Sequence, residues 1–224
     1  MNFESITNDD EYENCIQDAR QIPSIDKSLF CPNFYYVFHA ELEIHLNRYF
    51  IQRPREQWSL GFVDHNFLPP MYFLNVNLST NQPYQIFRYP DHILKIVHNA
   101  KIKYCCRQCQ YEWTTARGRA VFQAELPQEN KYNILFAYLF TQICQKCLRD
   151  IEPCWYVDEA TRVMKNICRI LKENFYSNFQ SSDDEDNYEN QRLSVTRNSH
   201  QYNLCPACQN GSCFGSNLQQ KGKK

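Results

Sequence analysis

Six cysteines form three Cys-x-x-Cys pairs, and these are the residues of the chain best suited to hold a metal ion. In such a turn two thiolates converge on one ion while backbone amides point at the sulfurs, so that two turns together can build a tetrahedral Zn²⁺ site. The pairs are Cys106/Cys109, Cys144/Cys147 and Cys205/Cys208.

Two further residues supply the ligands that the third pair lacks. His200 lies before Cys205/Cys208 and Cys213 lies after it, which brings the candidates to eight and allows two closed four-coordinate sites. The simplest arrangement puts the first two pairs in one site and the third pair with His200 and Cys213 in the other. A crossed arrangement, in which the C-terminal cysteines share an ion with the earlier pairs, remains open. The predicted cofactor is two structural Zn²⁺ ions.

Twelve cysteines also allow a disulfide framework, which is typical of secreted chains. Residues 1–20 are acidic and polar, without the basic and apolar regions of a signal peptide, so we expect a cytoplasmic, reducing environment. There, clustered pairs are more often zinc ligands than bridges. Cys105 is interpreted as a bystander beside Cys106, and Cys168 as a small buried residue of a helix.

The chain is not expected to be an enzyme, because closed cysteine-rich shells leave no coordination position for activating water. A thioredoxin-like redox role needs a reactive pair at the start of a helix, whereas the pairs are expected on hairpins. His92 and His98 are close enough to the first pair to be spare ligands, a less favoured alternative.

The bulk composition indicates a globular chain with a core of its own. It has 224 residues, of which 43% are hydrophobic and 15% aromatic, and a formal net charge of -1 argues against a protein that coats nucleic acid. The longest apolar stretch, residues 134–144, is shorter than the roughly 20 residues that cross a bilayer. We therefore expect no transmembrane segment, and membrane association only through a partner.

Hydrophobic periodicity predicts an α+β fold in which antiparallel β-hairpins carry the zinc knuckles and α-helices pack against them. A helix is predicted over residues 158–176, with Asp158 as its N-cap, and another over 30–49, where a strand is the alternative. Residues 2–20 are expected to form a helix and 51–70 an irregular connector. Strands are expected at residues 71–78, 101–105, 111–113, 118–124 and 131–143, with a short strand or helical turn at 93–97.

The same patterns divide the chain into six parts. The central part is the zinc-binding core, and an abrupt acidic run after it reads as a flexible linker. The parts are an N-terminal helical lead (1–26), a mixed globular part (27–100), the zinc-binding core (101–176), the linker (177–199), the His/Cys motif (200–214) and a basic tail (215–224).

Three motifs together resemble the 3CxxC-type zinc-binding family, and within it the receptor-transporting proteins. The first is Cys106-Arg-Gln-Cys109 followed by Trp113, the second is Cys144-Gln-Lys-Cys147 with the helix that ends near Leu171, and the third is the closing His200 to Cys213 motif. The resemblance covers about half of the chain, residues 101–214. It implies an intracellular zinc protein that binds chemosensory G-protein-coupled receptors and promotes their delivery to the cell membrane.

A related branch, the zygote arrest proteins, shares the closing motif and is associated with RNA binding. A mixture of basic and aromatic residues around the first pair could contact phosphates and stack on bases, although an ordinary solvated strand face is the simpler interpretation. RNA is therefore the alternative partner to membrane receptors. The residues of this basic-aromatic set are Lys95, Lys101, Lys103, Arg107, Arg117, Arg119, Tyr104, Tyr111 and Trp113.

Overall fold

A computed structural model describes residues 30–31, 34–53, 56–63, 84–89, 93–126, 133–176 and 201–210. Several sequence predictions lie outside these residues: the helix at 2–20, the strand at 71–78, the linker at 177–199 and the basic tail. In the part of the chain that is described, no helix is both long and apolar enough to cross a membrane.

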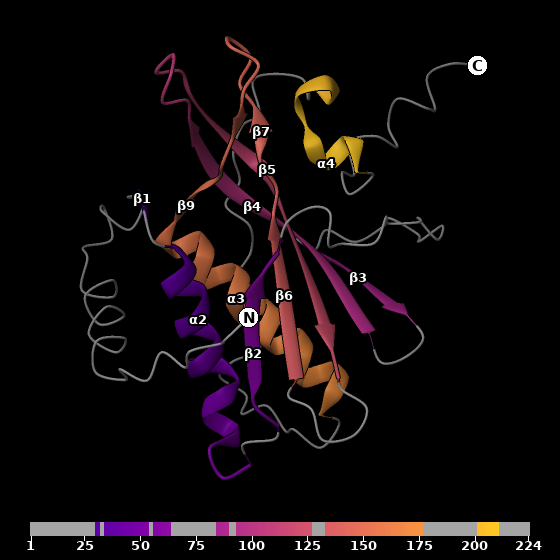
Figure 1. Ribbon diagram of the computed structural model, residues 1–224. Helices are drawn as coiled ribbons and strands as arrows, with labels where there is room; N and C mark the ends of the chain where they lie inside the picture. The colour runs from indigo at the N-terminus through magenta and orange to yellow at the C-terminus, as the bar shows by residue number, and fades with distance from the viewer. Residues whose placement is uncertain are drawn as a thin grey trace.

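A mixed sheet of seven strands forms the body of the protein (Figure 1). The strand order is β1-β9-β4-β5-β6-β2, and β3 also pairs with β4. Every neighbouring pair is antiparallel except β2 and β6, which run parallel. The strands are β1 (Phe30–Cys31), β2 (Trp58–Phe62), β3 (Tyr84–Tyr89), β4 (Ile93–Cys105), β5 (Glu112–Glu125), β6 (Asn133–Leu139) and β9 (Cys154–Tyr156), and a separate two-stranded ladder joins β7 (Gln142–Ile143) to β8 (Asp150–Ile151).

The long hairpin of β4 and β5 connects the sheet to the first cysteine pair. The first half of β4 pairs with β3 and its second half pairs with β9, and a β-bulge between Ala100 and Ile102 separates the two halves. Gly118 faces this bulge, and a Cβ atom there would lie 2.4 Å from Cδ1 of Ile102. Glycine is therefore required for the two strands to approach so closely. Beyond the bulge the hairpin extends from the sheet to Cys106.

Two helices cover one face of the sheet and lie side by side in Figure 1. They are α2 (Phe34–His45), which continues into a 3₁₀ turn at Asn47–Phe50, and α3 (Val157–Phe175). Phe38 and Leu42 on α2 and Leu46 just after it are buried and spaced by four residues, as one helical face requires. Trp155 packs edge-on against Phe38, with ring centroids 5.1 Å apart.

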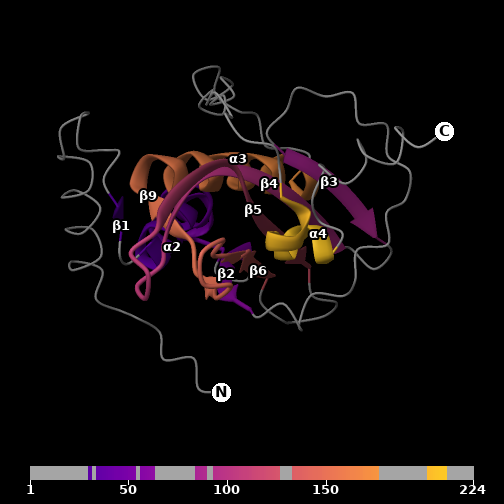
Figure 2. The ribbon, with the colours of Figure 1, turned by 90° about the horizontal axis from the view of Figure 1, so that it is seen from above.

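The C-terminal segment packs on the opposite face of the sheet, against the side chains that alternate away from the two helices. Ile96 faces the two helices, whereas the neighbouring Val97 faces the other way and packs with Val121, Cys205 and Ala207. The C-terminal segment consists of a 3₁₀ turn (Tyr202–Leu204) and α4 (Pro206–Gln209), and Figure 2 shows α4 and α3 on different sides of β4.

The α+β class and the helices predicted at 30–49 and 158–176 agree with the structure. Residues 93–97 form a strand, one of the two alternatives, and belong to the long β4. Two details were wrong. Residues 58–62 form β2 rather than a connector. The N-cap of α3 is Tyr156, while Asp158 lies in the first turn, where a carboxylate is still favoured by the helix dipole.

Candidate metal centre

The first two cysteine pairs lie on backbone turns of the same design. The amide of Gln110 donates to the carbonyl of Cys106, and the amide of Leu148 donates to the carbonyl of Cys144, each at 2.8 Å. Gln110 and Leu148 both have a φ of 56°, so each turn closes through a residue in the left-handed region. These are the turns that let both sulfurs of a Cys-x-x-Cys pair face the same side.

A two-stranded ladder lies beside each of these two knuckles. The amide of Cys106 donates to the carbonyl of Tyr111 at 3.0 Å, which closes the end of the β4–β5 hairpin. The amide of Cys144 donates to the carbonyl of Arg149 at 2.8 Å, which closes the β7–β8 hairpin. The sheet therefore fixes the first knuckle, and the short second hairpin must be held by other contacts.

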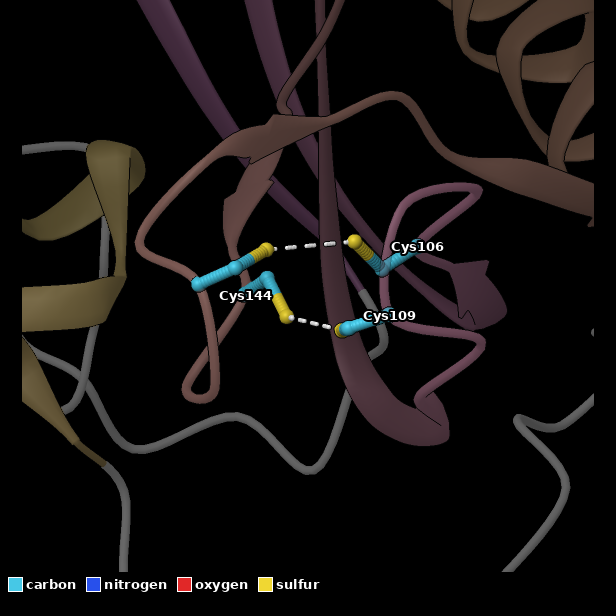
Figure 3. A group of neighbouring side chains, drawn as sticks. Cys106, Cys109 and Cys144 are labelled. Atoms are coloured by element: carbon cyan, nitrogen blue, oxygen red, sulfur yellow. Dashed lines mark hydrogen bonds between the residues drawn. The ribbon is translucent and has the colours of Figure 1, made fainter.

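The four cysteines converge on one point between the two hairpins (Figure 3). Their Sγ atoms all lie within 4.8 Å of one another. Across the gap, the sulfurs of Cys106 and Cys147 are 3.3 Å apart and those of Cys109 and Cys144 are 3.5 Å apart, and all four are free cysteines. Zn–S bonds of about 2.3 Å in a tetrahedron place sulfurs about 3.8 Å apart. The four residues therefore fit a Zn²⁺ ion, which would be closed off by four thiolates.

The backbone around the sulfurs favours the thiolate that zinc requires. The amide of Cys109 points at the sulfur of Cys106 and lowers the pKa of that thiol to about 6. Burial opposes ionisation of Cys144, but the amides of Cys147 and Lys146 outweigh it and lower its pKa as well. The hydrogen bond with Cys106, followed by burial, raises the pKa of the Cys147 thiol to about 12.

Contacts outside the ligands clasp the two hairpins together. Nε1 of Trp113, on the first hairpin, donates to Oε1 of Gln142 on the second at 2.6 Å. The ring of Trp113 stacks between Tyr104 and Tyr111, with centroid separations of 5.3 Å and 5.5 Å. Nζ of Lys146 lies 4.7 Å from the ring centroid of Tyr111. These contacts could not be predicted from the sequence, because the partner of each side chain is set only once the two hairpins have folded.

Three exposed cations lie on the knuckles themselves: Arg107, Lys146 and Arg149. Four thiolates around one Zn²⁺ carry a net charge of two minus, so cations this close to the sulfurs offset it. Cys105 stays outside the four-cysteine group, and Cys168 is buried in the core, as the sequence predicted for both.

The third pair is placed differently. Cys205 is the N-cap of α4, and the amide of Cys208 donates to its carbonyl at 2.9 Å, so this pair opens a short helix and the expectation of a hairpin is wrong for it. Cys205 is buried against the sheet and Cys208 is half-buried. His200 and Cys213 lie outside the described residues. Among the residues that are described, neither Cys205 nor Cys208 joins the first four cysteines.

Three members of the basic-aromatic set, Lys95, Tyr104 and Arg119, are buried and cannot reach a nucleic acid. Tyr104 is 0% exposed and donates its hydroxyl to the carbonyl of Phe140, and Arg119 is 3% exposed and donates to the side chain of Asn99. Lys103 forms an ion pair with Glu112 at 2.8 Å. His98, the spare ligand considered above, is buried under α3 and lies outside the four-cysteine group, while His92 lies outside the described residues.

Two Cys-x-x-Cys hairpins that face each other around one closed four-thiolate site define a structural zinc-ribbon protein. The model of the 3CxxC zinc-ribbon family, described as a zinc-binding domain, matches residues 99–211, which is half of the chain. The chain belongs to this family. No curated protein and no solved structure matches it.

Proposed function

We propose that this protein is a zinc-dependent adaptor that binds membrane receptors of the chemosensory G-protein-coupled type and promotes their targeting to the cell membrane. The observation that carries the proposal is the membership of the 3CxxC family, together with the likeness of residues 142–171 to receptor-transporting proteins. In the fold this segment runs from the second knuckle through β9 into α3 without interruption. A client that binds it would contact a surface that zinc holds in place.

Zinc has a structural role in this proposal. The four thiolates occupy every position of a tetrahedral ion, so the metal supplies rigidity and no activated water. The adaptor works from the cytoplasmic side, where thiols remain reduced and available for zinc.

The C-terminal motif is proposed to hold a second zinc ion through Cys205, Cys208, His200 and Cys213. We expect the purified chain to bind two zinc ions. Changing Cys205 and Cys208 together to Ser should leave one, because the first four cysteines form a complete site without them. Elemental analysis by mass spectrometry measures the ratio. Two ions retained in the double variant would refute the eight-ligand assignment, and none retained would favour the crossed arrangement.

Receptor delivery is tested by co-expression. A chemosensory receptor that reaches the surface poorly should show several-fold more surface label with the wild-type chain, and little gain with a variant in which Cys144 and Cys147 are Ser. A variant with Cys105 changed to Ser is the matched control, because it removes a thiol beside the site and leaves the four ligands intact.

The same cells distinguish the two partner classes. Receptors recovered with the affinity-purified chain support the adaptor function. Unchanged surface label across several receptors, with RNA recovered in a salt-dependent manner, would refute it in favour of RNA binding.

A further inference from the structure

A groove of about 410 Å³ opens beside the second knuckle, within the size range of sites that hold ligand groups. Its lining residues come from the start of α2, the ends of β2 and β6, and the segment from β8 to β9. Tyr35, Phe62, Tyr138 and Leu139 line its walls, and Asp150 and Glu152 lie on the side of the hairpin.

The walls of the groove are aromatic. Tyr35 and Phe62 meet edge to face with ring centroids 4.6 Å apart, and Tyr138 is a further lining residue. Tyr35 is 45% exposed, so part of its ring is accessible to a partner. An aromatic surface of this kind offers π-faces to a cation and apolar area to the carbon chain that carries it.

The charged groups of the groove are both acidic. Burial and the nearby charge of Glu152 raise the pKa of Tyr35, which places this carboxylate beside the phenol. Asp150 accepts a hydrogen bond from the hydroxyl of Thr141 at 3.3 Å and is otherwise exposed. Within the described part of the chain, no Lys or Arg lines the groove to neutralise these carboxylates. Aromatic walls with an acidic rim are complementary to Lys and Arg side chains.

We propose that this groove binds a short basic segment of a partner protein, in which Lys or Arg residues alternate with apolar ones. The inference rests on the adaptor function proposed above and names what the adaptor recognises. Membrane proteins concentrate Lys and Arg in the short cytoplasmic segments next to their transmembrane helices. A juxtamembrane segment therefore has the chemistry that the groove accepts, and it is present in receptors of unrelated sequence.

Zinc positions the acidic rim of this groove. β7 and β8 have two residues each, too few for a hairpin to be stable alone, and they lie directly on either side of Cys144 and Cys147. Thr141 directly precedes this hairpin and Asp150 is the first residue of β8, so the metal site fixes the positions of their side chains. The shape of the groove therefore depends on the zinc ion.

The test uses the full zinc-loaded chain and two fluorescein-labelled peptides of ten residues. One alternates arginine with leucine, and the other has glutamate in place of arginine. We expect saturable binding of the arginine peptide only. A double change, Asp150→Asn with Glu152→Gln, should weaken binding about fivefold to tenfold, in line with the loss of two partly exposed ion pairs. Fluorescence anisotropy measures both affinities, and zinc content and the melting temperature confirm that the fold is intact.

The matched control changes two carboxylates away from the groove, Glu56→Gln with Glu173→Gln, and alters net charge by the same amount. Both residues form exposed ion pairs elsewhere, with Arg53 and Arg169. The control should bind the arginine peptide as the wild type does. Equal loss in both double variants, unchanged binding in the groove variant, or equal binding of the two peptides would each overturn the proposal.

Two further outcomes separate this inference from the proposed function. If the groove variant changes the sedimentation of the chain and leaves peptide affinity unchanged, the groove holds a second copy of the chain and the proposal is wrong. If the wild-type chain binds the arginine peptide through the groove but raises no receptor to the surface, the groove is supported and the trafficking function is refuted.

Discussion

Changing Cys106 to Ser is expected to remove about one zinc ion per chain and to destabilise the zinc end of the protein by more than about 4 kcal/mol, the range typical of a lost metal site. Cys106 is 1% exposed and its sulfur faces Cys147 across the gap at 3.3 Å. A hydroxyl in its place is a poor zinc ligand, and without the ion the remaining three thiolates lose the cation that offsets their charge.

The loss should be concentrated in the two hairpins. The sheet core has its own apolar packing between the strands and the two helices, whereas the β7–β8 hairpin has zinc and the Trp113–Gln142 clasp. Amide hydrogen exchange should therefore accelerate at residues 104–113 and 142–151 while protection within β5 and β6 persists.

The neighbouring thiol provides the control for this prediction. Cys105 is adjacent to Cys106 but lies outside the four-cysteine group. The variant with Cys105 changed to Ser should therefore keep its full zinc content. If Cys105→Ser loses the ion and Cys106→Ser retains it, the register of the first knuckle is wrong.

The zinc knuckles could be predicted from the sequence because their geometry is local. The conformation of five consecutive residues sets where the two sulfurs of a Cys-x-x-Cys turn lie. The alternation of apolar and polar residues at 101–105 predicts the strand that leads into the first turn. That Cys106 and Cys109 share one site with Cys144 and Cys147 follows only from the pairing of β4 with β5 and of β5 with β6, which the structure supplies.

β2 could not be predicted because its partner is distant and its own signals oppose a strand. Pro54 and Gly61 suggest a loop, and the strand pairs in parallel with β6, more than 70 residues further along the chain by the register of Trp58 with Asn133. The side chain of Asn47 fixes this edge, because it accepts from the amide of Trp58 at 2.7 Å and donates to its carbonyl at 2.9 Å. The side-chain amide of Asn47 therefore holds the start of β2 in place, and no periodic pattern in the sequence predicts this contact.

The role of His98 was equally hidden, because it depends on a polar network between β4 and α3. Nδ1 of His98 lies 2.8 Å from the carbonyl of Asn99, and the amide of Asn166 donates to Nε2 at 3.2 Å. Since a carbonyl can only accept and the Asn166 amide donates here, the ring carries its proton on Nδ1 and is neutral. Arg162 donates to the same Asn99 carbonyl at 3.0 Å and pairs with Glu159 at 2.8 Å.

This neutral histidine is expected to make the stability of the protein fall in mild acid. Burial, the Arg162 guanidinium on α3 and, more weakly, Arg119 on β5 lower the pKa of His98 to about 3, below the value of 6.5 for a free histidine. The unfolded chain takes up a proton below about pH 6.5 and the folded chain does not, so its contribution to stability is present above that pH and is lost as the pH falls toward 3. The slope approaches about 1.4 kcal/mol per pH unit, and between pH 7.5 and 5.0 the loss is about 2 kcal/mol.

A variant with His98 changed to Gln isolates the contribution of this histidine to the pH dependence of stability. Acid also protonates the zinc ligands, but that cost is common to both proteins, so the difference between their pH profiles belongs to His98. Urea unfolding at several pH values measures the free energy of unfolding. Its dependence on pH should be steeper for the wild type than for the variant, by an amount that corresponds to up to one proton, even though the variant is less stable at pH 7.5. Parallel profiles would mean that His98 accepts a proton inside the fold. Its hydrogen-bond partners, the Asn99 carbonyl and the Asn166 amide, and the facing guanidinium of Arg162 do not accommodate that proton without breaking the network that joins α3 to the sheet.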